Sequence, residues 1–180
     1  MKVAFLDRDG VINEEVGYLH EADQFKYTYK CIEALHRIKL LGYKLAIVSN
    51  QAGIGKGIFT IDQYHTLSDH IINDLKSNGV EILETMFCPH IEGALIQEFD
   101  LDCSYRKPKP GMINFICDKY SVDRSGSFLV GDKLTDGEAG IAAGIGEIYL
   151  VRSGHRLPGS ISSKFKVFED LYHVSKSLND

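Results

Sequence analysis

FLDRDGVIN, residues 5–13, joins a short apolar run directly to Asp7, Arg8, Asp9 and Gly10. Side chains two positions apart point to the same side of a strand, so Asp7 and Asp9 bring two negative charges together at the strand end. That arrangement is costly unless a cation or a set of strong donors lies between them. The alternative is a solvated turn, since Asp-Gly is a common turn dipeptide, and the remaining sequence discriminates between the two.

Short β-rich runs alternate with helical segments along the rest of the chain. Strands are expected at residues 2–7, 43–50, 81–88, 127–132 and 146–151. Helices are expected at residues 29–42, 60–79, 111–120, 136–144 and 168–178. This alternation predicts an α/β fold with a doubly wound, Rossmann-like parallel sheet. Ligands bind at the carboxyl ends of such strands, so LDRDG, VSNQ and VGDKLTD should meet at one edge.

Length and composition narrow the class of protein. The 180 residues suffice for a single domain spanning 1–180. A net charge of −5 leaves no general basic surface for nucleic acid. No apolar run approaches the roughly 18 residues of a membrane span, and no export leader is visible at the N-terminus, so we expect a cytoplasmic protein. The four cysteines should then remain reduced.

The polar strand ends predict chemistry on phosphate. Asp7, Asp9 and Asp132 supply the oxygen ligands that suit Mg²⁺. Ser49 and Asn50 add a hydroxyl and an amide, and Lys107 and Lys133 add positive charge. Such a centre suits phosphoryl transfer, in which negative charge spreads over the transferring group, and an aspartate can serve as nucleophile.

Two other features are expected to carry no chemistry. GIGKG, residues 53–57, lacks the Ser or Thr that follows the lysine of a phosphate-binding loop, and is expected to be a flexible loop near the site. The histidines outside the CPH segment show no ligand spacing, and surface or helix positions explain them. They are His20, His36, His65, His70, His155 and His173.

DRDG, SN at 49–50, Lys107 and GDKLTD together resemble the four motifs of the haloacid dehalogenase superfamily of phosphatases. The similarity spans essentially the whole chain and implies a minimal cap made of loops. It implies that Asp7 attacks phosphorus and that Asp9 is the acid and base. Mg²⁺ would lie on Asp7, the Asp9 carbonyl and Asp132, while Ser49 and Lys107 hold the phosphoryl oxygens. Asp136 would fix a lysine or a loop, or simply begin a helix.

FLDRDGVIN, GYLH, SNQAGIGKG, CPH and RKPKPGM resemble more narrowly the heptose bisphosphate phosphatases within that superfamily. This resemblance implies removal of the 7-phosphate of D-glycero-D-manno-heptose 1,7-bisphosphate through an aspartyl-phosphate, in nucleotide-heptose biosynthesis. We expect the protein to be a monomer. The substrate-binding residues it implies are Glu15, Val16, Gly17, Tyr18, Ser49, Asn50, Gln51, Ala52, Arg106, Lys107 and Lys133. A histidinol-phosphate phosphatase or another small sugar-phosphate phosphatase is the alternative. The intact motifs disfavour a third possibility, a non-enzymatic binding module.

The related phosphatases carry a zinc loop of the form Cys-x-His, a spacer, and Cys-x-Cys before Arg-Lys-Pro. Residues 88–105 match it at Cys88, His90 and Cys103, but the fourth position is Tyr105. A closed structural zinc site requires four ligands. Two outcomes therefore remain open. Zinc is held with water, Asp102 or the Tyr105 phenolate as fourth ligand, or the loop is metal-free and held by packing of Tyr105.

Overall fold

The computed structural model describes residues 1–178 and contains a single six-stranded parallel sheet in the order β3-β2-β1-β4-β5-β6. The strands are β1 Val3–Leu6, β2 Lys44–Asn50, β3 Ile82–Cys88, β4 Phe128–Gly131, β5 Glu147–Val151 and β6 Lys166–Phe168. The helices are α1 Cys31–Leu40, α2 Ala52–Gly55, α3 Ile61–Ser77, α4 Gly111–Tyr120, α5 Leu134–Ala142 and α6 Leu171–Ser177. Short 3₁₀ turns lie at η1 Ala22–Gln24 and η2 Gln97–Phe99. The predicted doubly wound α/β fold is confirmed.

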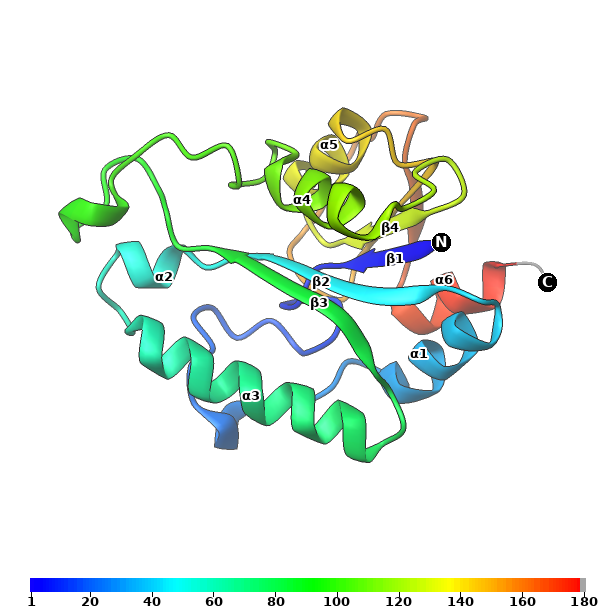
Figure 1. Ribbon diagram of the computed structural model, residues 1–180, viewed down its shortest axis with the longest axis horizontal. Coiled ribbons are helices and arrows are strands. Elements are labelled where there is room, and N and C mark those ends of the chain that lie inside the picture. The colour runs from blue at the N-terminus through cyan, green and yellow to red at the C-terminus, as the bar shows by residue number, and fades with distance from the viewer. Residues whose placement is uncertain (179–180) are drawn as a thin grey trace.

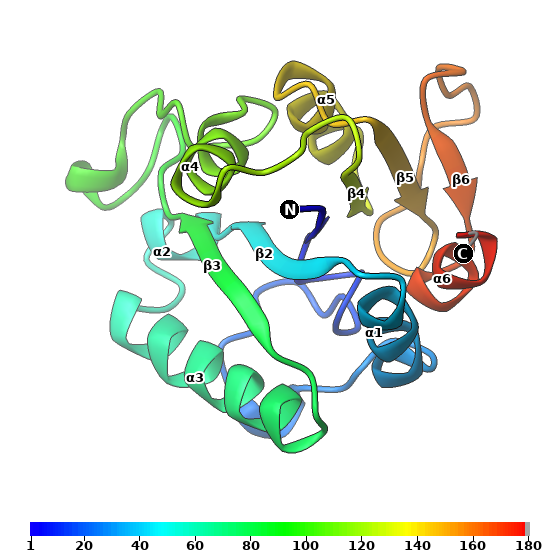
Figure 2. The same ribbon diagram turned by 45° about the vertical axis from the view of Figure 1, so that its right-hand side comes forward.

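Helices cover both faces of the sheet (Figures 1 and 2). Successive side chains of β1 point to opposite faces, as the period of two in a strand requires. Val3 and Phe5 pack with α4 and α5, while Ala4 and Leu6 pack with α1, α3 and α6. Burial on both faces explains why the central strands β1 and β4 are continuous apolar runs rather than alternating ones.

The register of the sheet aligns the strand ends that carry the polar motifs. Leu6 at the end of β1 pairs with Ile47 of β2 on one side and Val130 of β4 on the other. The Asp7 backbone N–H continues this ladder to the Val130 carbonyl at 2.9 Å. Residues 7–9, 49–51 and 132–136 therefore leave the sheet at one edge, as predicted.

Two elements differ from the expectation. Residues 52–55 form helix α2 instead of a flexible loop. Its glycines permit close packing, because a Cβ on Gly53 would lie 2.2 Å from the Phe59 ring and one on Gly55 would lie 2.8 Å from the Pro89 carbonyl oxygen. Strand β6 was not predicted, since its three residues are too few to show a periodic pattern. Within residues 1–178, no helix is both long and apolar enough to cross a bilayer.

Candidate active site

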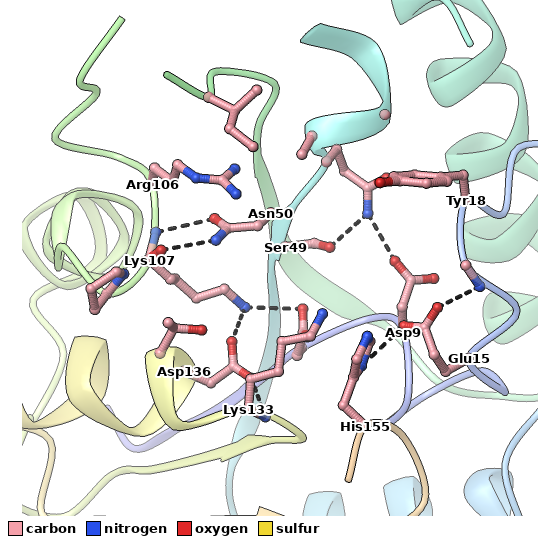
Figure 3. Close-up of a pocket in the computed structure, with 18 of the residues that line it drawn as sticks. Asp9, Glu15, Tyr18, Ser49, Asn50, Arg106, Lys107, Lys133, Asp136 and His155 are labelled. Carbon is pink, nitrogen blue, oxygen red and sulfur yellow. Dashed lines mark hydrogen bonds and ion pairs between the residues drawn. The ribbon is translucent and has the colours of Figure 1, made fainter. Parts of the chain in front are cut away.

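A buried lysine lies between two carboxylates at the carboxyl edge of the sheet. The Lys107 ammonium is 2.7 Å from Asp136 Oδ1 (Figure 3). It is also 3.0 Å from Asp7 Oδ1, and it donates to the Val48 carbonyl at 2.8 Å. Burial disfavours the ammonium, but Asp136 and Asp7 outweigh it and raise the pKa of Lys107. Lys107 is thus a fixed positive charge beside Asp7, as expected of a group that holds phosphoryl oxygens.

The negative charge of the carboxylates around Asp7 exceeds the positive charge that Lys107 supplies. Burial, with help from the Asp136 and Asp9 carboxylates, raises the pKa of Asp7 to about 6 despite the opposing effect of Lys107. A divalent cation beside this carboxylate would offset the repulsion and favour its ionised form.

Asp132 offers the second half of a cation site. Its side chain is wholly buried, and its Oδ1 atom has no hydrogen-bond partner. One carboxylate oxygen each from Asp7, Asp132 and Asp136 lies within 4.8 Å of the others. The backbone at Gly10 lies close to the Asp132 carboxylate, since a Cβ on Gly10 would lie 2.6 Å from Asp132 Oδ2. An unsatisfied buried oxygen in an all-oxygen donor set fits a hard cation such as Mg²⁺.

Asp9 is held differently from Asp7. Its carboxylate accepts hydrogen bonds from Arg8 at 3.0–3.1 Å, from Asn13 Nδ2 at 3.0 Å and from Gln51 Nε2 at 2.9 Å. Burial alone would raise its pKa, but the Arg8 charge and these hydrogen bonds overcome burial and lower the pKa of Asp9. Two neighbouring carboxylates with opposite pKa shifts suit different roles in one reaction.

The residues after β2 organise the site. Ser49 is buried, and its hydroxyl accepts from Gln51 Nε2 at 2.7 Å. The Asn50 amide donates to the Lys107 carbonyl at 3.0 Å and accepts from the Lys107 backbone N–H at 3.1 Å. The side chain of Asn50 therefore fixes the segment that carries Lys107, and its predicted contact with substrate stays a prediction.

A cavity of about 560 Å³ opens above these residues. Most of the predicted substrate-binding residues line it: Glu15, Gly17, Tyr18, Ser49, Asn50, Gln51, Ala52, Arg106, Lys107 and Lys133. Val16 does not line it and is half exposed. In the described part of the chain, Lys56, Arg106 and Lys133 border the cavity without a carboxylate in ion-pair contact. The cavity therefore favours an anionic ligand with more than one charged group.

Sequence reasoning missed three residues of the site. Arg8 is buried against Asp9, and Lys56 lies at the cavity, where its ammonium donates to the Tyr18 hydroxyl at 2.9 Å. A surface or helix position was expected to explain His155, and its side chain is indeed exposed, but it also lines the cavity and contacts Asp132. Its position just after β5 was the available signal, because β5 ends at the same edge as β1, β2 and β4.

The predicted metal loop brings its three ligands together. One atom each from Cys88, His90 and Cys103 lies within 4.8 Å of the others. Tyr105 contributes its backbone N–H, which donates to Cys103 Sγ at 3.4 Å. Burial above all, with the adjacent Cys103 thiol, raises the pKa of Cys88 to about 11. The Arg106 guanidinium donates to the His90 carbonyl at 2.9 Å, which ties this loop to the cavity.

Two family models match the chain. The polynucleotide kinase 3 phosphatase model matches residues 2–140, and the HAD-hydrolase-like model matches residues 104–180. D-glycero-alpha-D-manno-heptose-1,7-bisphosphate 7-phosphatase of Photorhabdus laumondii is 52% identical over 99% of this chain and 97% of its own length. D-glycero-beta-D-manno-heptose-1,7-bisphosphate 7-phosphatase of Escherichia coli K12 is 41% identical, over 83% of this chain and 78% of its own.

A solved structure has the same architecture. It is D,D-heptose 1,7-bisphosphate phosphatase from B. bronchiseptica, complexed with magnesium and phosphate. The TM-score is 0.82 at 29% identity, and the match covers 98% of this chain and 97% of that one.

Proposed function

This chain belongs to the haloacid dehalogenase-like phosphatases, and on that premise we propose that it removes the 7-phosphate of D-glycero-D-manno-heptose 1,7-bisphosphate. The assignment of the substrate rests on one observation, the 52% identity, over nearly all of both chains, to a phosphatase named for this compound. The cavity supports it, because Lys107 balances charge at the reacting end while Arg106, Lys133 and Lys56 remain for a second phosphate.

The reaction proceeds through Asp7. Its carboxylate oxygen attacks phosphorus and forms an aspartyl-phosphate as the bond to the sugar oxygen breaks. Asp9 gives a proton to that oxygen and later takes one from the water that cleaves the acyl phosphate. Asp9 is ionised in the free protein, so it must take up a proton when substrate binds. The negative charge of the arriving phosphate favours that uptake.

Mg²⁺ would be held by the Asp7 carboxylate, the Asp9 backbone carbonyl and Asp132. When bound, it supplies Lewis-acid stabilisation of the negative charge on the phosphoryl oxygens. Lys107 and the Ser49 hydroxyl bind those oxygens from the protein side. Asp136 keeps Lys107 charged and in place at 2.7 Å, and its other carboxylate oxygen accepts from the Lys133 backbone N–H at 2.9 Å.

The substrate assignment is tested by phosphate release from both anomers of the heptose 1,7-bisphosphate and from histidinol phosphate. We expect the bisphosphates to give the higher kcat/KM. The α anomer should be preferred, because the relative named for it is 52% identical, against 41% for that named for the β anomer. Faster hydrolysis of histidinol phosphate would reject the heptose assignment while leaving the phosphatase chemistry in place.

Arg106→Ala should reduce kcat/KM for the bisphosphate about 10- to 100-fold more than for an aryl monophosphate, the size of one charged hydrogen-bond pair. The guanidinium can bind the non-reacting phosphate through two parallel hydrogen bonds, and a simple monoester has no such group. Arg106→Lys is the matched control, because it keeps the charge without the planar fork, and its loss should be intermediate. Equal losses on both substrates would make Arg106 a structural residue.

We propose that the loop at 88–105 binds zinc through Cys88, His90 and Cys103, more weakly than a four-ligand site would. A position filled by water leaves the ion open to chelators. Tyr105→Cys should complete the set, tighten zinc and raise the melting temperature. Metal content by plasma emission, on both proteins purified without chelator, is the measurement. Zinc in the variant alone would mean that the wild-type loop holds its shape without metal, and zinc in neither would remove the metal from the proposal.

The remaining features of the proposal concern the chain as a whole. We further propose that the chain forms a single domain spanning 1–180 and acts as a monomer. A cytoplasmic location is consistent with the four unpaired thiols of Cys31, Cys88, Cys103 and Cys117.

A further inference from the structure

The segment after β5 folds over the carboxylate of Asp132. The backbone N–H of His155 donates to Asp132 Oδ2 at 2.8 Å, and the ring Nδ1 lies 2.7 Å from the same oxygen. The backbone at Gly154 lies so close to Asp132 that a Cβ on this residue would be 2.1 Å from the same oxygen. The preceding residue, Ser153, anchors the segment by donating its hydroxyl to the Gly10 carbonyl at 2.6 Å.

The two carboxylate oxygens of Asp132 differ in their hydrogen bonding. Oδ2 accepts both hydrogen bonds from His155, whereas Oδ1 is buried and has none. A carboxylate can only accept, so the Nδ1 atom of His155 carries the proton in this contact. Together, the two donors restrict rotation of the carboxyl group and leave the buried Oδ1 atom without a protein partner and open to a cation.

His155 also contacts the loop that carries Glu15, Gly17 and Tyr18 and lines the cavity. Glu15 Oε2 lies 3.5 Å from His155 Nδ1, and Glu15 Oε1 accepts from the Gly17 backbone N–H at 2.6 Å. Figure 3 shows His155 and Glu15 side by side, across the cavity from Arg106 and Lys107. The ring therefore lies between Asp132 and the loop that carries Tyr18.

We propose that His155 is a positioning residue, which fixes the Asp132 carboxylate for the divalent cation and links it to the Glu15 loop. The proposal rests on the Mg²⁺-dependent function above. Groups that hydrogen-bond to metal ligands orient them, and their loss typically weakens metal binding about 10- to 100-fold. His155 meets that description through a side chain that no motif of the sequence singled out.

The test is Mn²⁺ binding to the full chain, measured by electron paramagnetic resonance, with His155→Ala, His155→Asn and His155→Gln. His155→Ala should weaken Mn²⁺ about 10- to 100-fold. The amide nitrogen of asparagine can replace Nδ1, so His155→Asn should restore most of the affinity. In His155→Gln the amide lies one carbon further out and should not. The Mg²⁺ concentration for half-maximal aryl-phosphate hydrolysis should rise by a larger factor than kcat at saturating Mg²⁺ falls.

His173→Ala is the matched control. Its Nδ1 lies 2.8 Å from Asp170 Oδ1, so it makes the same kind of pair, but it lies on α6 and does not line the cavity. Unchanged Mn²⁺ affinity in a folded His155→Ala would overturn the proposal, as would tighter binding or rescue by glutamine instead of asparagine. Equal weakening in His173→Ala would also overturn it. Mn²⁺ is read without substrate, so weaker binding in His155→Ala supports the proposal even if the heptose bisphosphate is not hydrolysed.

Discussion

Asp7→Asn is expected to reduce turnover by at least about a thousandfold, the size of the loss when a nucleophile is removed. The amide of asparagine cannot form the acyl phosphate through which the reaction passes. The change is nearly isosteric, so the surrounding contacts can persist. The Lys107 ammonium lies 3.0 Å from Asp7 Oδ1, and an amide oxygen in that place can still face it.

Phosphate release under saturating Mg²⁺ measures this effect, and the melting temperature reports whether the variant is folded. Asp170→Asn provides a matched control: Asp170 is also buried, it caps α6 away from the cavity, and asparagine caps helices equally well. Turnover in the control should match wild type. Residual activity of Asp7→Asn above about one part in a thousand would argue that another group attacks phosphorus.

Asp9→Asn provides an independent check on the same intermediate. It should cripple turnover, because the amide cannot give a proton to the sugar oxygen or take one from water. Phosphate can then accumulate on Asp7, where mass spectrometry of the intact protein would detect it. Absence of any phospho-aspartate in this variant would weaken the covalent mechanism.

The edge where the active site forms was predictable because it is encoded locally. Buried parallel strands are continuous apolar runs, and a polar residue at the end of such a run marks its carboxyl end. Asp7, Ser49 and Asp132 each follow an apolar run directly, and the sheet brings β1, β2 and β4 together at one edge. The helix over 111–120 was predicted to the residue.

The contacts between remote segments were not predictable in the same way. His155 lies 23 residues from Asp132 in sequence, and only the fold brings the two together. The GIGKG stretch looked flexible because glycine usually is, but here Phe59 and Pro89 occupy the space that side chains would need. In both cases the deciding partner is distant along the chain. The place of His155 just after β5 could indicate the edge of the sheet where it lies, but no local pattern could indicate its contact with Asp132.

Lys107→Met should lower both activity and stability strongly. Methionine matches the unbranched lysine side chain as far as Cε, and it leaves Asp7 and Asp136 facing each other without their shared cation. Breaking a buried ion pair by removing one partner costs about 3–5 kcal/mol of unfolding free energy. Loss of a donor aimed at the phosphoryl oxygens should reduce turnover about 10²- to 10³-fold. Urea unfolding without divalent metal and phosphate release with saturating Mg²⁺ measure the two effects separately.

The double variant Lys107→Met, Asp136→Asn separates charge balance from catalysis. Neutralising Asp136 removes one of the two stranded carboxylates, so much of the lost unfolding free energy should return. Turnover should not return, because nothing replaces the ammonium at the phosphoryl oxygens. Recovery of both would mean that Lys107 only neutralises Asp136 and takes no part in the reaction. Recovery of neither would mean that the instability comes from the Val48 carbonyl, which loses its 2.8 Å donor, and not from the carboxylates.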